Sequence, residues 1–204
     1  MDKFQTVLAV MEDYAAAHHV PIISREGGRL LHSLAAAAKP TSVLEVGTAI
    51  GYSTLLLTAA LAPGGQITTI EQNLERIELA RTYLTQAGAS DQVTILAGDA
   101  GLILPEVSGS FDFVFIDAAK GQYLDYLHKI MDKLSPDAVI VADNVLFRGW
   151  VLDYGSIVPR RYRTIIKRLR AYLDFVTNDG HFKTTLYHIG DGIAVSHYQG
   201  ETNI

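Results

Sequence analysis

The feature that most constrains this chain is a short apolar segment followed by two glycines in the spacing Gly-x-x-x-Gly. Residues 43–46 are too few and too rich in β-branched side chains for a helix, and an apolar run over 54–61 follows Gly47 and Gly51. This order is typical of a strand, a tight turn and a helix in an α/β sheet. Such a turn lies at the carboxyl end of its strand, where the backbone can approach a ligand closely. We therefore expect the chemistry at that edge.

The acids around the turn indicate which ligand it holds. A dinucleotide-binding turn has a further glycine that lets the backbone touch a pyrophosphate, and this turn lacks it. Glu45, just before the turn, would repel phosphate but would suit a cationic ligand with an amino group, such as S-adenosylmethionine. Glu71 ends the next predicted strand, where an acid that binds ribose belongs in this topology. Two glycines alone also occur where loops need tight packing, so the acids carry the prediction.

Strands and helices are predicted to alternate after the turn, with strands at 66–70, 93–97, 111–116 and 137–142 and helices at 73–87, 99–106 and 120–134. This alternation predicts a doubly wound α/β sheet whose first five strands are parallel, with right-handed crossovers. A basic helix at 159–176 is followed by strands at 183–189 and 192–198, linked only by Gly190-Asp191. Because so short a link cannot make a parallel crossover, the last of the seven strands is expected to be antiparallel.

The composition favours one domain over 1–204, with N-terminal helices in 1–40 and an α/β core in 41–204. The helices are expected at 2–17 and 25–38. The absence of cysteine excludes disulfides, thiolate catalysis and cysteine-ligated zinc. No signal-peptide core is recognised, and no apolar run approaches the roughly 20 residues of a membrane span. We expect a cytoplasmic protein that does not cross a membrane.

Polar residues end three of the predicted strands on the edge that holds the glycine turn. They are Asp99, Asp117 and the pair Asp143-Asn144. Oxygen ligands from Asp117, Asp143 and Asn144 suit a hard cation, magnesium, manganese or calcium, better than zinc. An Asp after a strand is also a common helix N-cap. A pair of adjacent ligands and a third nearby favour the metal site.

With these motifs the chain resembles the cation-dependent O-methyltransferases related to catechol and caffeoyl-coenzyme A O-methyltransferases, from about His18 to Tyr198. The resemblance implies a Rossmann-like methyltransferase fold that binds S-adenosylmethionine. It also implies a role for each matching residue: Glu45 and Glu71 would hold the methionine part and the ribose, and Asp99 with Ala100 would lie near the adenine. Asp117, Asp143 and Asn144 would hold the metal. Further cofactor contacts would come from Ile23, Gly47, Gly51, Ser53 and Asp117.

The resemblance also implies a mechanism, in which Lys120 is the general base and Asp117 takes part in catalysis. Lys120 would remove a hydroxyl proton while the metal binds two neighbouring substrate oxygens and fixes them in line with the methyl group. Without that role, Lys120 would be a solvated residue at a helix start. No acid matches the residue that binds the second catechol hydroxyl in the animal enzymes, which argues against catechol itself.

Longer motifs resemble the bacterial branch that methylates 5-hydroxyuridine at the wobble position of tRNA, giving 5-methoxyuridine. They are His-His-Val-Pro-Ile, Gly-Thr-Ala-Ile-Gly-Tyr-Ser, Ile-Asp-Ala-Ala-Lys-Gly-Gln-Tyr, Asp-Asn-Val-Leu-Phe-Arg-Gly and the basic helix after Pro159. The 5-hydroxyl and the C4 carbonyl of that base would form a chelating oxygen pair, as in a catechol. A small catechol-like substrate is therefore the alternative.

A basic stretch supports the tRNA interpretation. Seven of the 17 Lys and Arg residues lie between Arg148 and Arg170, against one acid, Asp153. Arg148, Arg160 and Arg161 are expected to hold phosphates that flank an extruded base of the tRNA anticodon region. The plainer interpretation is the solvated face of an amphipathic helix.

Three further expectations concern the class and assembly of the protein. A nicotinamide-dependent oxidoreductase would need a glycine-rich pyrophosphate turn, which is missing. An RNA-binding module without catalysis would explain the basic helix but not Glu45, Glu71 or the Asp-Asn pair. The helix at 2–17 and the apolar hairpin near 183–198 offer surfaces that predict a homodimer.

Overall fold

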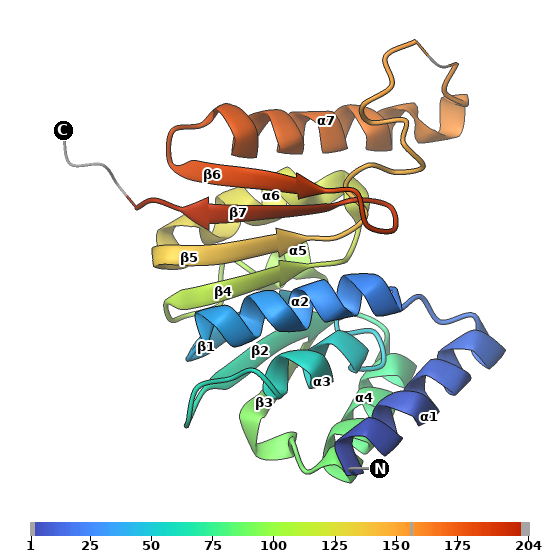
Figure 1. Ribbon diagram of the computed structural model, residues 1–204, viewed down its shortest axis with the longest axis vertical. Helices are drawn as coiled ribbons and strands as arrows, with labels where there is room; N and C mark the ends of the chain where they lie inside the picture. Colours follow the sequence, from blue (N-terminus) through green and yellow to red (C-terminus); the bar gives the residue numbers. More distant parts are fainter. Residues whose placement is uncertain (1–2, 156, 201–204) are drawn as a thin grey trace.

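The computed structural model describes residues 3–155 and 157–200. Two helices, α1 (Lys3–His18) and α2 (Arg25–Ala38), precede the first strand, and strands and helices then alternate (Figure 1). The strands are β1 (Ser42–Val46), β2 (Gln66–Glu71), β3 (Val93–Ala97), β4 (Phe111–Ile116), β5 (Leu134–Ala142), β6 (Phe182–Tyr187) and β7 (Ile193–Tyr198). The other helices are α3 (Tyr52–Thr58), α4 (Leu74–Ala87), α5 (Ala100–Ile103), α6 (Tyr123–Ile130) and α7 (Arg163–Asn178), with the 3-10 turns η1 (Ser90–Gln92), η2 (Lys120–Gln122), η3 (Met131–Lys133) and η4 (Arg160–Tyr162).

The strands form one seven-stranded sheet in the order β3-β2-β1-β4-β5-β7-β6. The strands β1 to β5 pair in parallel, and β7 pairs antiparallel with both β5 and β6. This confirms the predicted doubly wound sheet and its antiparallel last strand. The order reverses direction at β1, so the carboxyl ends of β1 and β4 lie beside each other, where α/β sheets bind their ligands.

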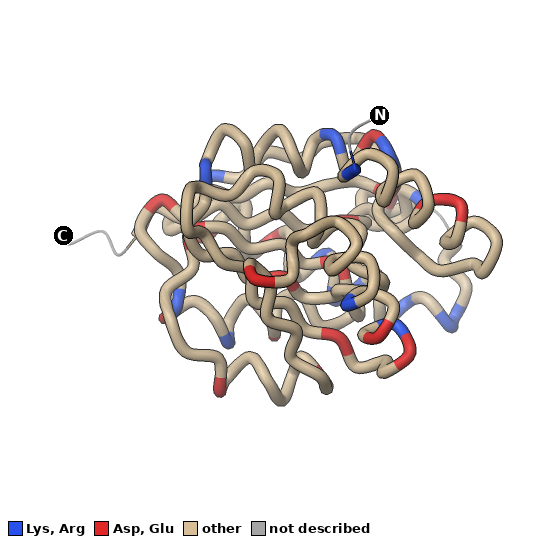
Figure 2. Tube along the Cα trace, turned by 90° about the horizontal axis from the view of Figure 1, so that it is seen from below, with Lys and Arg blue, Asp and Glu red and all other residues tan. Residues whose placement is uncertain are grey.

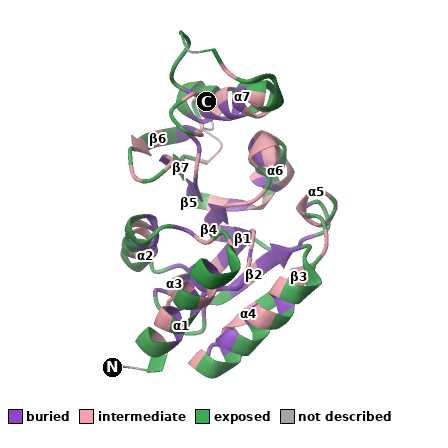
Figure 3. Cartoon of the chain, turned by 90° about the vertical axis from the view of Figure 1, so that its right-hand side faces the viewer, coloured by how far each residue is buried: buried purple, intermediate pink, exposed green. Residues whose placement is uncertain are grey.

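The core lies on both faces of the sheet, because alternate residues of each strand point to opposite sides. On β4, Phe113 and Phe115 pack in one apolar cluster with residues of α1 to α4, whereas Val114 and Ile116 pack in the other with residues of α5 to α7. Figure 3 shows the resulting pattern, with buried strands in the middle and helices exposed on their outer sides. This burial holds the strand ends that carry the candidate site.

Some boundaries differ from those expected. The first helix runs from Lys3 to His18, and Asp2, which we expected to begin it, lies outside the described residues. The prediction that two residues link the last strands is wrong. The β6 strand ends earlier than expected, at Tyr187, and β7 begins later, at Ile193, so residues 188–192 join them. This link is tied to the chain after β5 by Val145 N–H donating to Gly192 O at 3.0 Å and Leu146 N–H donating to Asp191 O at 2.8 Å.

Two expectations about surfaces can be compared with the described residues. The exposed large apolar side chains are Val10, Leu74, Leu102, Leu152, Tyr154 and Ile157. Val10 lies on α1, but none of these six lies in the hairpin, so the homodimer stays a prediction. None of the described helices is long and apolar enough to span a membrane.

Candidate active site

The glycine turn joins the ends of β1 and β4. Gly47 has φ +107°, and a Cβ built there would lie 2.1 Å from the Asp117 carbonyl oxygen. Only glycine therefore allows the turn to pass this close to the end of β4. Gly51, with φ +89°, precedes α3 and faces Ala80 of α4. The turn thus brings α3, α4 and β4 together around one space.

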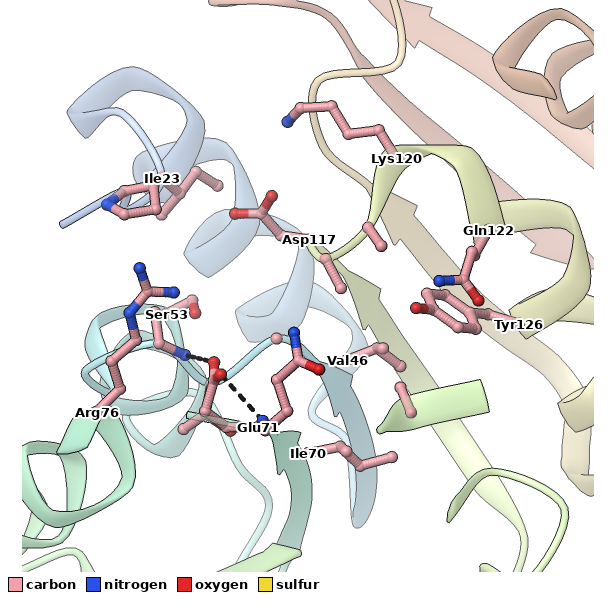
Figure 4. A pocket seen from close by; sticks show the side chains of 18 of the residues that line it. Ile23, Val46, Ser53, Ile70, Glu71, Arg76, Asp117, Lys120, Gln122 and Tyr126 are labelled. Atoms are coloured by element: carbon pink, nitrogen blue, oxygen red, sulfur yellow. Dashed lines mark hydrogen bonds between the residues drawn. The ribbon is translucent and has the colours of Figure 1, made fainter. Parts of the chain in front are cut away.

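That space is a cavity of about 460 Å³ at the carboxyl ends of the parallel strands (Figure 4). The predicted site residues that line it are Ile23, Gly47, Ser53, Glu71, Asp99, Ala100, Asp117, Lys120 and Asn144. They come from the segment before α2, from the ends of five strands, from α3 and from η2. The predicted residues outside its lining are Glu45, Gly51, Asp143, Arg148, Arg160 and Arg161. The parallel topology therefore brings most of the predicted site together.

Glu45 lies in β1, two residues before Gly47. Its side chain is fully buried and accepts hydrogen bonds from Ser53 Oγ at 2.6 Å, Thr54 Oγ1 at 2.5 Å and Thr69 Oγ1 at 2.6 Å. Burial raises the pKa of the Glu45 carboxyl, and the three hydroxyl donors oppose that rise. Glu45 is not among the residues that line the cavity, and these hydroxyls are its hydrogen-bond partners, so its expected contact with the methionine part stays a prediction. Glu45 fixes the first turn of α3 against β1 and β2.

Glu71 lies at the end of β2 and lines the cavity. Its Oε2 accepts the Ala49 N–H at 2.9 Å, and its Oε1 accepts the N–H groups of Gln72 and Asn73 at 3.0 and 2.9 Å. Figure 4 draws hydrogen bonds to this carboxylate as dashed lines. Three backbone donors fix its orientation, and Oε2, which accepts only one of them, keeps a lone pair for a ligand hydroxyl. This placement suits the predicted ribose contact.

The opposite wall contains residues that sequence reasoning missed. Asp99 caps α5 by accepting the Gly101 N–H at 2.7 Å, and Gln122 and Tyr126 lie beyond it in the cavity wall. Burial, followed by the charges of Asp99 and Asp125, raises the pKa of Tyr126 to about 12. Gln122 and Tyr126 are four residues apart around the start of α6, a spacing that places two side chains on one helix face. That spacing, directly after Lys120, was the available signal.

Two carboxyl groups meet at the ends of β4 and β5. Burial raises the pKa of Asp117, and the nearby Lys120 ammonium lowers it. The pKa of Asp143 rises to about 7, mainly through burial and then through the charge of Asp117. Asp143 Oδ1 accepts the Asn144 N–H at 2.7 Å, and Tyr123 donates its hydroxyl to the Asp143 carbonyl oxygen at 3.0 Å. The charge of the half-buried Asp117 disfavours the charge of the buried Asp143, and a cation between them would stabilise both carboxylates.

The chemistry of the donor set fits a hard divalent cation. Asp117, Asp143 and Asn144 supply carboxylate and amide oxygens, the ligands that Mg²⁺, Mn²⁺ and Ca²⁺ prefer. Among the described residues no cluster of three or more His, Cys, Asp and Glu side chains is placed to hold a metal, so the amide oxygen of Asn144 is needed. In this structure the Lys120 ammonium donates to Asn144 Oδ1. A positive charge thus already stands beside the predicted metal ligands.

The basic stretch reaches the site at one point. The α7 helix packs against η2, and Arg168 donates to the Gly121 carbonyl oxygen at 3.3 Å, next to Lys120. Arg148 lies 5.6 Å from the Tyr162 ring centroid, and Arg161 lies 4.6 Å from it. Arg170 donates instead to backbone carbonyls of the chain after β5, including Val151 O at 2.8 Å, so it supports the fold. In Figure 2, Lys, Arg, Asp and Glu are scattered along the side of the trace that faces the viewer.

Known proteins that are similar to this chain in sequence and in fold are described as O-methyltransferases. A family model described as O-methyltransferase matches residues 5–198. A catechol O-methyltransferase of Niastella koreensis is 37% identical over 141 residues. The match covers 67% of this chain and 64% of that protein, so this chain spans less than two thirds of the relative's length. A caffeoyl-CoA O-methyltransferase 1 of Eucalyptus globulus is 29% identical over 199 residues, covering 91% of this chain and 78% of that protein. The solved structure of the O-methyltransferase TomG from Streptomyces achromogenes, in complex with SAM, is 28% identical with a TM-score of 0.85, covering 95% and 90% of the two chains.

Proposed function

The chain belongs to the O-methyltransferase family, and from this premise we propose that it transfers the methyl group of S-adenosylmethionine to a substrate hydroxyl. One observation carries the proposal: Lys120, Asp117 and Asn144 line the same cavity as the glycine turn and Glu71. The cofactor would lie along the turn, with its ribose on Glu71 and its adenine toward Asp99 and Ala100. Its sulfonium methyl would then face the acids at the ends of β4 and β5. Calorimetry with S-adenosylmethionine tests this arrangement, and a protein that does not bind it would contradict the proposal.

The proposed metal ligands are Asp117, Asp143 and Asn144, with Mg²⁺ as the expected ion and Mn²⁺ or Ca²⁺ as alternatives. When bound, such an ion lowers the pKa of a hydroxyl and orients two neighbouring oxygens. Lys120, once neutral, would accept the hydroxyl proton at Nζ. The substrate oxygen then forms a bond to the methyl carbon as the carbon–sulfur bond breaks, and the electron pair stays on sulfur as a neutral thioether. The buried strand ends limit the access of water to this step.

The proposed substrate is 5-hydroxyuridine at the wobble position of tRNA. Its hydroxyl lies beside the C4 carbonyl, which gives the oxygen pair that the donor set requires. Support also comes from the chain that continues from Asn144, where Arg148 and Arg161 lie over the Tyr162 ring. Nucleoside mass spectrometry of tRNA from a deletion strain is the test. Accumulated 5-hydroxyuridine with loss of 5-methoxyuridine is expected, and unchanged nucleosides would contradict this substrate.

A small catechol-like molecule is the second candidate substrate, because the Niastella koreensis relative is described as a catechol O-methyltransferase. Transfer to purified undermodified tRNA and to a catechol, measured side by side with the same enzyme, distinguishes the two. Efficient transfer to the catechol alone would favour the small-molecule function.

We also propose that two copies of the chain form a homodimer. The half-exposed Val10 on α1 is the apolar contact that the described N-terminal helix offers. Sedimentation at micromolar concentration is expected to give twice the chain mass of 22.3 kDa. A single species with the mass of one chain would contradict the proposal.

A further inference from the structure

The cavity contains a cation that the proposed mechanism leaves without a role. Five charged residues line it: Glu71, Arg76, Asp99, Asp117 and Lys120. Lys120 donates to Asn144, whereas Arg76 makes no hydrogen bond or ion pair through its guanidinium with any residue that the structure describes. In Figure 4 the Arg76 side chain reaches from α4 toward the side of the cavity where Ser53 and Ile23 lie. Its guanidinium is therefore available to a ligand.

The position of Arg76 in its helix argues against a role in helix stability. It lies in the first turn of α4, where Asn73 Oδ1 accepts the Arg76 N–H at 3.0 Å. The positive end of the helix dipole disfavours a cation there. Arg81 of the same helix has a partner, Glu78 Oε1, at 2.9 Å. Arg76 has no such compensation, because the adjacent Glu75 projects in another direction.

Four backbone donors of the glycine turn, those of Gly47, Thr48, Ala49 and Gly51, are already used inside the protein. The N–H groups of Gly47 and Thr48 both donate to Ile70 O, and that of Gly51 donates to Thr48 O. The Ala49 N–H donates to Glu71, and the Ser53 hydroxyl donates to Glu45. The α3 helix that follows is short, so it adds little dipole. An anionic group bound beside this turn would need its charge matched from elsewhere.

We propose that Arg76 binds the carboxylate of the cofactor's methionine part. This inference rests on the proposed function, because that cofactor is a zwitterion whose only anionic group is this carboxylate. The other lining charges on this side are acidic and suit its ribose hydroxyls, ammonium and sulfonium. A guanidinium can donate two parallel hydrogen bonds to a carboxylate, which gives both charge matching and orientation. Arg76 would thus distinguish the complete cofactor from analogues without the acid group.

Two ligands that differ only in the carboxylate test the proposal: S-adenosylmethionine and decarboxylated S-adenosylmethionine. Calorimetry should give an Arg76→Gln variant that binds S-adenosylmethionine about tenfold or more weakly, as expected when a charge-assisted bond is lost. The same variant should bind the decarboxylated ligand unchanged or more tightly, because a cation facing a cationic ligand is removed. Arg76→Lys, which keeps the charge but not the planar fork, should recover part of the affinity for S-adenosylmethionine.

Arg81→Gln is the matched control on the same helix and should leave both affinities unchanged. An equal loss of both ligands in Arg76→Gln, or no loss of either, would overturn the assignment while leaving the proposed cofactor in place. A wild-type protein that does not bind S-adenosylmethionine would overturn the proposed function and this inference together. Thermal unfolding of each variant confirms that the folded protein is being compared.

Discussion

The acids on the two sides of the glycine turn differ in how many hydrogen bonds their carboxylates accept. On the β1 and β2 side, Glu45 accepts three hydroxyl hydrogen bonds and Glu71 accepts three backbone N–H groups. On the β4 and β5 side, Asp143 accepts the N–H of Asn144, and Asp117 has no hydrogen-bond donor among the described residues. At the same edge of one sheet, the carboxylates on one side thus accept three hydrogen bonds each, whereas those on the other side accept one or none.

This difference separates acids that organise the site from acids that can act in it. A carboxylate surrounded by donors is rigid and contributes shape. The half-buried Asp117 and the buried Asp143 accept few hydrogen bonds, so they keep lone pairs for an external cation and favour protonation without one. Burial and then the charge of Asp117 raise the pKa of Asp143 to about 7. The predictions below test this division, starting with the largest expected effect.

Asp143→Ala is expected to lower the rate of methyl transfer about a thousandfold or more, which corresponds to a rise of about 4 kcal/mol in the activation free energy. Cofactor affinity should stay nearly unchanged, because Glu71 and the turn lie on the other side. Radiolabel transfer and calorimetry measure the two quantities. Asp137→Asn, at the other end of the same strand, is the control. Full turnover of Asp143→Ala in the presence of a chelator would remove the metal assignment.

Glu45→Ala should lower the free energy of unfolding by about 3 kcal/mol, because three buried hydroxyls lose their acceptor. Urea denaturation measures the loss. Glu78→Ala removes an exposed acid paired with Arg81 and should change stability by less than about 1 kcal/mol. If Glu45→Ala kept its stability but lost cofactor affinity, Glu45 would be a direct ligand contact after all.

Glu71→Ala is expected to weaken cofactor binding by about 1–3 kcal/mol, the range for a lost charge-assisted hydrogen bond. The loss should be smaller for an analogue without the ribose 2′-hydroxyl, since that ligand makes fewer bonds to the carboxylate. Calorimetry at one temperature gives both values. Unchanged affinity for both ligands would exclude the ribose contact.

The pH dependence of stability without metal should report the β4 and β5 side. Burial and the charge of Asp117 raise the pKa of Asp143 to about 7, so the folded state binds this proton more tightly than the unfolded chain. The stabilisation is fully present below about pH 4 and is lost as the pH rises through about 7. Denaturation in a chelator should show this slope, and Asp143→Asn should flatten it. An equal slope in both proteins would contradict the shifted pKa.

The smallest effect is expected outside the cavity. Replacing Arg160 and Arg161 together with alanine should raise the Michaelis constant for tRNA about fivefold, which corresponds to about 1 kcal/mol, and flatten its salt dependence, because fewer phosphate contacts form. Transfer to a small catechol should stay nearly unchanged. Equal loss on both substrates would mean that these arginines support the fold.

The sequence by itself determined the sheet, its antiparallel last strand and the edge where the site lies. Parallel strands joined by helices must place their carboxyl ends together. The backbone positions of Glu71, Asp99, Asp117 and Asn144 therefore lie at one edge of the sheet, whichever way their side chains point. The glycine at position 47 also follows from this logic, because the turn must pass the end of a neighbouring strand.

Only the tertiary structure decided where individual side chains point. The pleat of β1 turns Glu45 toward the hydroxyls of Thr69 and α3 and away from the cavity, and this depends on strand register and on the rotation of the helix. Helix rotation likewise brings Arg76 and Tyr126 into the cavity wall. Hydrophobic periodicity specifies which face of an element is buried. The position of the polar group at the end of a side chain is set instead by the packing of neighbours that are distant in sequence.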